Sequence, residues 1–226
     1  MTRDFQKLER VLSKQRFDSY KKPGHTEHES FSLYVWNTML CESLYAPFQI
    51  LEVGARNAIH SEIAVAIKQP EWLNIEHGFL HEDEKEAIKE AKQALAKRRS
   101  PCGEPELVAE MSFGFWTSLI DSRYETLWHK IIIGVFPHMP KHIRTRGEIS
   151  KRMNAARKLR NAAFHHHSIW HWKDLKDQHF ELRNLIRWIC PSIDEMAFRI
   201  DRFPRIYRLG AKESTRILGD EWDYSI

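Results

Sequence analysis

The chain has 226 residues, 42% hydrophobic and 29% charged, which is ordinary for a globular protein and argues against disorder. The net charge of +4 is too small to indicate nucleic-acid binding by itself. The longest apolar run, Ile131 to Phe136, is far too short to span a bilayer, and the first residues contain no signal-peptide core. We therefore expect a cytoplasmic protein that does not contact the membrane.

The N-terminal half predicts a series of helices. Residues 3–17 have apolar side chains at helical spacing, and the KKPG sequence at 21–24 ends that helix. Residues 31–40 are apolar on most faces, as in a buried helix. Pro47 suits the first turn of the next helix, which we expect to run to Ile67 and to stop before Pro70.

The middle of the chain predicts three more helices. One begins at the acidic residues 82–84 and ends at the basic residues 97–99, which matches the helix dipole at both ends. A loop at 100–105 follows. Residues 111–120 and 124–132 then predict two short helices, whose aromatic residues we interpret as core rather than as a platform for stacking bases.

The C-terminal part begins with a basic helix from about Thr145 to Phe164. Asp174 can cap a last long helix, which ends before Pro191, and Pro191 begins a shorter segment to about Phe203. Residues 204–226 form a basic tail without an assigned structure. Nothing alternates with period two for long, so we predict an all-α, single-domain helical bundle over residues 1–226.

The basic helix concentrates positive charge. Residues 141–165 contain eight Lys or Arg and one acidic residue, Glu148, and such an excess attracts a polyanion. The alternative is a solvated helix face, which most charge runs are. The residues that we expect to contact RNA are Lys151, Arg152, Arg157 and Lys158.

The end of this helix has residue types suited to phosphate chemistry. Arg160 is followed by Asn161 and, five residues after the arginine, by His165. Arginine binds phosphate well, and histidine exchanges a proton near neutral pH. His165 could take the proton from a ribose 2′-hydroxyl while Arg160 neutralises the phosphorane, and Asn161 could orient the ring or bond a phosphate oxygen. The alternative is that these residues are surface and capping groups.

Helix geometry constrains this site. On a regular helix Arg160 and His165 would point about 140° apart. Either the helix ends or bends near Phe164, or the site is assembled from two copies of the segment in a two-fold homodimer.

Two other features resemble sites. Arg56, Asn57 and His60 partly repeat the pattern, and are either auxiliary to a phosphate site or a polar stripe in a helical core. His167 and His171 are four apart and could ligate a metal, but only histidines lie close to them in sequence. We therefore expect neither a metal nor a cofactor. Cys41, Cys102 and Cys190 are odd in number and widely spaced, which favours reduced thiols.

Several segments resemble the bacterial Abi-like family (abortive infection, phage resistance) of the HEPN superfamily (higher eukaryotes and prokaryotes nucleotide-binding). They are spread over residues 31–192, in the same order and spacing. The segments are LYVWN at 33–37, LEVGARNAIH at 51–60, MSFGFW at 111–116, YETLW at 124–128, LRNAAFHH at 159–166 and WICP at 188–191.

This resemblance implies a HEPN-like helical fold with additional N-terminal helices, commonly dimeric, and often a metal-independent endoribonuclease of phage defence or of a toxin–antitoxin pair. Arg160, Asn161 and His165 fall on the family motif, and His166 is a candidate auxiliary residue. The Abi-like pattern usually continues with Glu-Pro-Ile, whereas this chain continues with His167 and Ser168. Some HEPN proteins instead bind RNA or nucleotides without catalysis, as antitoxins or scaffolds. The resemblance thus implies RNA, a second copy of the chain and an antitoxin protein as partners.

Overall fold

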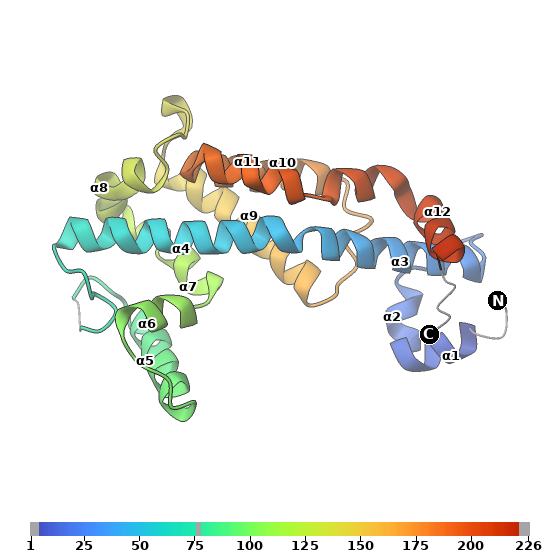
Figure 1. Cartoon of the computed structure of the whole chain (residues 1–226), viewed down its shortest axis with the longest axis horizontal. Coiled ribbons are helices and arrows are strands. Elements are labelled where there is room, and N and C mark those ends of the chain that lie inside the picture. Colours follow the sequence, from blue (N-terminus) through green and yellow to red (C-terminus); the bar gives the residue numbers. More distant parts are fainter. Residues whose placement is uncertain (1–4, 76–77, 222–226) are drawn as a thin grey trace. The chain divides into compact units, whose positions relative to one another are not determined.

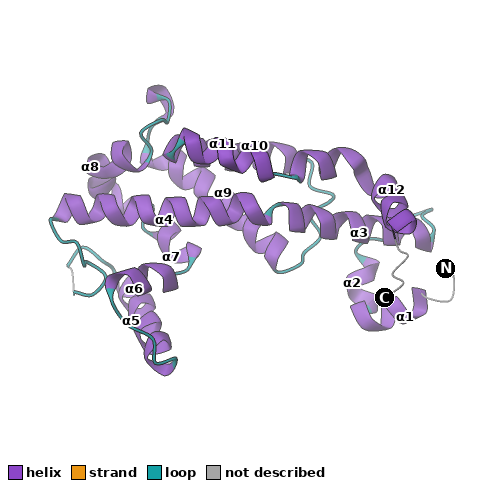
Figure 2. Ribbon diagram, in the orientation of Figure 1, coloured by secondary structure: helices purple, strands orange, loops and turns teal. Residues whose placement is uncertain are grey.

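The computed structural model of the chain describes residues 5–75 and 78–221. These residues are all-α and contain no strand (Figure 2), which confirms the all-α part of the predicted fold class. None of the described helices is long and apolar enough to cross a membrane. The α-helices are α1 Phe5–Leu12, α2 Lys14–Asp18, α3 Glu27–Ser43, α4 Tyr45–Ile67, α5 Glu82–Lys97, α6 Glu104–Glu110, α7 Phe113–Ser118, α8 Glu125–Val135, α9 Arg146–Phe164, α10 Leu175–Ile189, α11 Pro191–Ile200 and α12 Phe203–Glu221, with short 3₁₀ helices η1 Ser122–Tyr124 and η2 Lys141–Ile143.

The chain divides into two compact units. The first consists of Met1–Ala46, Leu159–Phe180 and Arg199–Ile226, and the second of Pro47–Lys158 and Glu181–Phe198. The prediction of one domain over residues 1–226 stays a prediction. The C-terminal end of α9, with the three histidines that follow it, belongs to the first unit.

The first unit is built around α3. A capping box starts this helix: the Thr26 hydroxyl accepts a hydrogen bond from the Glu29 backbone N–H at 3.2 Å, and the Glu29 carboxylate accepts one from the Thr26 N–H at 2.8 Å. Helix α12 packs along α3 (Figure 1), and the Trp36 indole N–H donates to the Ile206 carbonyl at 2.9 Å. The segment assigned no structure in the sequence is therefore largely helical, with a break at Gly210 (φ +71°), and its last residues, 222–226, lie outside the described residues.

The predicted first helix is interrupted. Residues 3 and 4 lie outside the described residues, and the remainder forms α1 and α2, separated at Ser13. Ser13 has φ +67° and caps α2 through a hydrogen bond that its hydroxyl accepts from the Arg16 N–H at 3.3 Å. Because a serine that caps one helix has non-helical backbone angles, the continuous helix predicted from apolar spacing was wrong at this residue.

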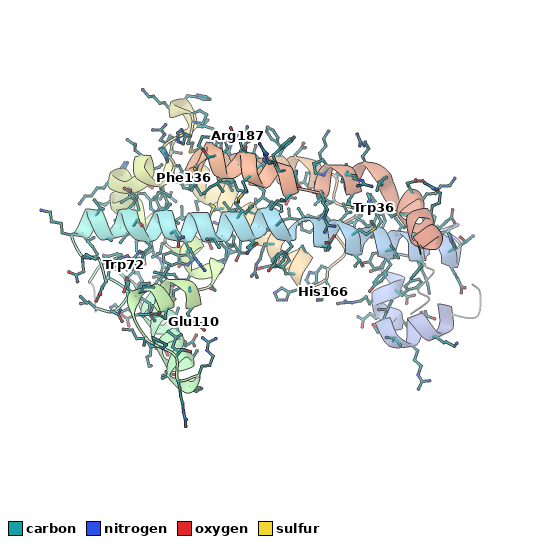
Figure 3. All side chains as sticks on the ribbon, viewed as in Figure 1. Trp36, Trp72, Glu110, Phe136, His166 and Arg187 are labelled. Atoms are coloured by element: carbon teal, nitrogen blue, oxygen red, sulfur yellow. The ribbon has the colours of Figure 1, made fainter. Side chains whose placement is uncertain are left out.

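The second unit has a core of large aromatic side chains. Trp72, Trp116, Trp128 and Phe136 are each at most 1% exposed, and Figure 3 shows Trp72 and Phe136 on the ribbon. This burial confirms that the aromatic residues of 111–120 and 124–132 are core. The predicted helices of this part are present as α7 and α8, and the loop at 100–105 is shorter because α6 begins at Glu104.

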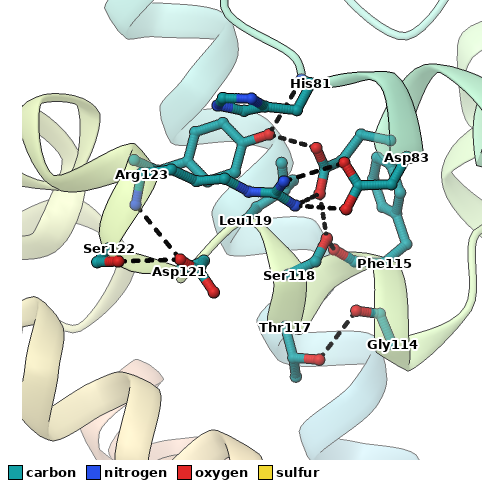
Figure 4. Close-up of polar contacts among 12 residues, drawn as sticks. His81, Asp83, Gly114, Phe115, Thr117, Ser118, Leu119, Asp121, Ser122 and Arg123 are labelled. Carbon is teal, nitrogen blue, oxygen red and sulfur yellow. Dashed lines mark hydrogen bonds and ion pairs between the residues drawn. The ribbon is translucent and has the colours of Figure 1, made fainter.

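A buried carboxylate ties α5 to α7 and η1 in the second unit. Figure 4 draws the polar contacts around Asp83, Ser118 and Arg123. The Glu84 side chain is 1% exposed. It accepts hydrogen bonds from the Tyr124 hydroxyl at 2.5 Å and the Ser118 hydroxyl at 2.8 Å, and it pairs with the Arg123 guanidinium at 2.5 Å. Arg123 also donates two hydrogen bonds to Asp83, at 2.7 and 3.0 Å. Every oxygen of the buried Glu84 thus has a partner, which explains how its charge is accommodated.

Candidate functional site

Helix α9 ends in a Schellman motif formed by residues 165–170, which we call the histidine segment. The His166 backbone N–H donates to the Ala163 carbonyl at 3.2 Å, and the His167 N–H donates to the Ala162 carbonyl at 2.8 Å. These are the two hydrogen bonds that define the motif. The helix therefore ends between Asn161 and the histidines, which is the first of the two geometries expected from the sequence.

His166 occupies the left-handed position of this motif, with φ +60°. Glycine is the usual residue there, because a side chain costs about 1–2 kcal/mol in left-handed backbone. His166 is exposed, so packing does not require an imidazole at this position. Lys68 after α4 and Arg99 after α5 have the same left-handed backbone, so this strain does not by itself assign His166 a function. Figure 3 labels His166 at the end of α9.

The three residues of the predicted catalytic motif lie around the same helix end. The Arg160 guanidinium is 4.9 Å from the centre of the Phe164 ring, and it donates a long hydrogen bond of 3.4 Å to the Asn161 side-chain oxygen. His165 is exposed, and its ring centroid lies 6.4 Å from that of His167. The structure thus groups Arg160 with Asn161, and His165 with His167.

The histidine segment is fixed to α3 by one buried side chain, Asn37, which is 3% exposed. Its amide nitrogen donates to the His167 carbonyl at 3.3 Å, and its oxygen accepts hydrogen bonds from the N–H groups of Ile169 at 2.7 Å and Trp170 at 3.1 Å. Sequence reasoning did not assign Asn37 a role. The signal was present, since a polar residue within an apolar helix needs buried partners.

A cavity of about 730 Å³ opens beside the histidine segment, wholly within the first unit. This volume is typical of small-ligand sites. We call it the aromatic cavity, because rings and aliphatic groups provide much of its wall. Its lining residues are Arg16, Tyr20, Tyr34, Asn37, Thr38, Cys41, Glu42, Ser43, Tyr45, Ala46, Ala163, Phe164, His166, Ile200 and Arg202.

A second hollow of about 560 Å³ in the same unit is more polar. We call it the histidine groove, because three imidazoles line it together with hydroxyl groups and one guanidinium. Its lining residues are Ser13, Gln15, Arg16, Ser19, Tyr20, His166, His167, Ser168, His171 and Trp172. Arg16, Tyr20 and His166 line both hollows, so the two hollows are neighbours on the same unit.

The charges at these hollows come from few groups. Burial raises the pKa of the Cys41 thiol to about 11 and that of the Tyr20 phenol to about 12, so both are neutral near neutral pH. The Arg202 guanidinium is paired with the Glu42 carboxylate. Arg16 and any protonated imidazole therefore supply the positive charge that an anionic ligand would meet.

The predicted RNA-binding residues of α9 are not equivalent. Lys151 and Lys158 are exposed and seven residues apart, so they share one helix face. Arg152 forms ion pairs with Glu148 and Glu181 and lies over the Trp188 ring, its guanidinium carbon 5.4 Å from the centre of that ring.

The fourth of these residues, Arg157, is half-buried and donates a hydrogen bond to the Asn154 side chain at 3.1 Å. The lysines are therefore better placed for phosphate contacts than the arginines.

The partial repeat of the motif lies in the second unit. The His60 ring is 2.8 Å from the buried Glu104 carboxylate and stacks on Trp72 at 5.5 Å between centroids. These contacts match the interpretation of His60 as a polar group within a helical core. Arg56 is half-buried and Asn57 is exposed. Their auxiliary role stays a prediction.

Among the described residues, no group of three or more His, Cys, Asp or Glu is arranged to hold a metal ion. The cysteines are all free thiols, and Cys102 is exposed. Three residues that sequence reasoning did not place at the site are Arg16, Tyr45 and His167 as a partner of His165. No local pattern could have found Arg16 or Tyr45, because they lie over 110 residues before the motif.

Comparisons with models of protein families, with curated proteins and with solved structures found no match. The resemblance to the Abi-like family therefore stays a prediction.

Proposed function

We propose that this protein is a metal-independent endoribonuclease, which cleaves RNA by attack of a ribose 2′-hydroxyl on the adjacent phosphate. The observation that carries the proposal is the pair of exposed imidazoles, His165 and His167, whose ring centroids are 6.4 Å apart at the end of α9. Cleavage of this kind needs one group that accepts a proton and one that donates a proton, on either side of a phosphate. The guanidinium of Arg160 on the same helix end supplies the third element, a cation for the phosphate.

The proposed reaction assigns one step to each imidazole. Neutral His165 takes the proton from the 2′-hydroxyl, and the 2′-oxygen forms a bond to phosphorus. The bond from phosphorus to the 5′-oxygen breaks, and protonated His167 gives its proton to that leaving oxygen. The products are a 2′,3′-cyclic phosphate and a free 5′-hydroxyl. DNA lacks the nucleophile and is not cleaved.

Arg160 would stabilise the charge that builds on the phosphorane oxygens, because a fixed cation favours the transition state over the ground state. Its stacking on Phe164 limits the freedom of the guanidinium before substrate binds. Asn161 holds the guanidinium through its side-chain oxygen or bonds a phosphate oxygen. We also propose a two-fold homodimer, in which this helix end of each copy faces the other across a shared RNA site.

The resemblance to the Abi-like family suggests the biological setting. We propose a role in phage defence, or as a toxin that a second protein neutralises, in the cytoplasm. Induced expression of the chain in a bacterial host would then arrest growth, and His165→Ala would restore it. Unchanged arrest by the variant would contradict the proposal that growth arrest depends on RNA cleavage.

A cleavage assay tests the enzymatic proposal directly. Purified protein is incubated with RNA in excess EDTA, and products are analysed by mass spectrometry for the 2′,3′-cyclic phosphate. We expect Arg160→Ala, His165→Ala and His167→Ala each to reduce cleavage about 100-fold or more. His129→Ala is the matched control, because His129 is also exposed but belongs to α8. Cleavage of an all-deoxy substrate, or cleavage unaffected by Arg160→Ala and His165→Ala, would refute the proposal.

A second candidate function is a non-catalytic module that binds RNA or a nucleotide, as an antitoxin or scaffold. The aromatic cavity favours it, because its volume and its mixture of rings with Arg16 suit a nucleotide. This candidate predicts binding that weakens with salt, without any product. A titration of labelled RNA at several salt concentrations, combined with the cleavage assay, separates the two candidates.

A further inference from the structure

The aromatic cavity and the histidine groove differ in chemistry but share part of their walls. Tyr34, Tyr45 and Phe164 bring rings to the cavity, whereas His167 and His171 line only the groove. A ligand that suits both must have a flat apolar part joined closely to an anionic part. A nucleotide has this construction, with the base on one side of the ribose and the phosphate on the other.

We propose that the aromatic cavity binds one unpaired base of an RNA strand whose phosphate lies in the histidine groove, so that the protein selects single-stranded RNA. This inference rests on the proposed function, because it identifies the form of RNA that the same site takes. It assigns Tyr45 as the residue on which the base stacks, and Arg16 as the cation that binds the neighbouring phosphate.

Tyr45 has the position that a stacking residue needs. It begins α4 and is 59% exposed, so its ring is accessible to a ligand. The centroid of its ring lies 5.9 Å from that of the Phe164 ring, and the two ring planes are 35° apart. The Phe164 ring in turn is covered by Arg160, the proposed phosphate-binding cation. Aromatic cavity and cleavage site therefore meet at Phe164.

The histidine groove lies beside the aromatic cavity, where the phosphate of a nucleotide with its base in the cavity would be. His166 lines both hollows from its left-handed backbone position, and Arg16 lines both from α2. A base in the cavity would thus place its own phosphate against the Arg16 guanidinium and the His166 imidazole. The His167 imidazole, the proposed proton donor, lines the same groove.

Selection for unpaired RNA follows from the cost of moving a base. A base in a duplex must leave its stack and its partner before it can enter a cavity, whereas a base in a single strand is already free to rotate. Stacking of one base on an aromatic side chain contributes enough to affinity to change it severalfold to about 100-fold. Without that contribution, the remaining contacts are to phosphates and do not distinguish an unpaired base from a paired one.

The experiment measures binding separately from cleavage. RNA oligonucleotides with a 2′-deoxy residue at the cleaved position are titrated by fluorescence anisotropy, and the cleavable versions are followed for rate. The probes are a single strand, the same strand in a duplex, the strand with one abasic position, and AMP as competitor. The variants are Tyr45→Ala, Tyr45→Phe and, as matched control, Phe180→Ala, because Phe180 is 58% exposed but does not line the cavity.

We expect Tyr45→Ala to weaken single-strand binding about tenfold and to raise KM by a similar factor, with Tyr45→Phe close to the wild type and Phe180→Ala unchanged. The duplex and the abasic strand should bind the wild type about tenfold more weakly than the intact single strand. Thermal unfolding verifies that each variant is folded.

Three results would overturn the inference: equal binding of single strand and duplex, no effect of Tyr45→Ala, or AMP that competes as well as the strand and so marks a free-nucleotide site. Binding that depends on Tyr45 but gives no cleavage would reject the proposed ribonuclease activity and keep the assignment of the aromatic cavity. Cleavage at an unchanged rate in Tyr45→Ala would keep the ribonuclease activity and reject the assignment of the cavity.

Discussion

The His167 backbone N–H donates to the Ala162 carbonyl at 2.8 Å, and this hydrogen bond brings the histidine segment back against the end of α9. The turn between these residues requires His166 to adopt a φ of +60°. The same backbone turn places His165 and His167 with their rings 6.4 Å apart. A helix that continued through these residues would have carried the two imidazoles about 160° apart around its axis.

Replacement of His166 by glycine should stabilise the protein. The left-handed position costs a side chain about 1–2 kcal/mol, and glycine loses about 0.4–1 kcal/mol more backbone entropy on folding, so the net gain is roughly 0.5–1 kcal/mol. Urea unfolding measures it. His166→Ala keeps the left-handed strain and should give no gain. Equal stabilities of the two variants would show that the backbone at this position is not strained.

Removal of the Asn37 side chain should be costly. Asn37→Ala leaves the Ile169 N–H without its hydrogen-bond partner in a buried setting, and we expect a loss of about 2–4 kcal/mol in the free energy of unfolding. The neighbouring variant Thr38→Ala, at an exposed position, should stay within about 0.5 kcal/mol of the wild type. Hydrogen exchange should also speed up at the amides of residues 167–170 in the Asn37 variant. Unchanged exchange would contradict the role of Asn37 in fixing the histidine segment.

Neutralisation of Glu84 tests the buried network of the second unit. Glu84→Gln removes the charge that pairs with Arg123, whose side chain is 29% exposed and can recover some hydration. We therefore expect a loss of about 2–3 kcal/mol in the free energy of unfolding, less than for a fully buried pair. Glu82→Gln is the control, since Glu82 is 90% exposed and its pair with Lys85 should contribute less than about 1 kcal/mol. Similar effects of both variants would argue against a special role for the buried carboxylate.

Cys41 should resist alkylation until strongly alkaline pH. Burial raises the pKa of its thiol from 9.0 to about 11, so the reactive thiolate is scarce in the folded protein at about pH 8. Iodoacetamide labelling followed by mass spectrometry should modify the exposed Cys102 first. Equal labelling rates of both thiols in the folded protein would contradict this prediction.

The same pKa shift predicts how stability depends on pH. The folded state keeps the Cys41 proton to a higher pH than the unfolded state does. The contribution of this thiol to the free energy of unfolding is therefore complete below about pH 9 and is lost as the pH rises to about 11. A Cys41→Ala variant should show a smaller decrease in the free energy of unfolding over this range. A steeper decrease in the free energy of unfolding of the variant would mean that folding lowers the pKa of Cys41, which would contradict the prediction.

The sequence by itself determined most of the helices, because their signals are local. The acidic start and basic end of α5, the position of Pro47 in the first turn of α4, and the apolar spacing of α9 each depend on residues within a few turns of one another. The local signals failed at Ser13, where a capping serine competed with helical spacing. They also failed in α12, a basic segment that packs along α3.

Only the tertiary structure decided what surrounds the motif. The sequence indicated Arg160, Asn161 and His165, but the aromatic cavity and the histidine groove are formed by side chains from α2, α3, the start of α4 and residues 200–202. Arg16 and Tyr45 reach the histidine segment because α3 packs against it through Asn37. Such contacts depend on how distant helices bury their apolar faces together, a requirement that no short stretch of sequence expresses.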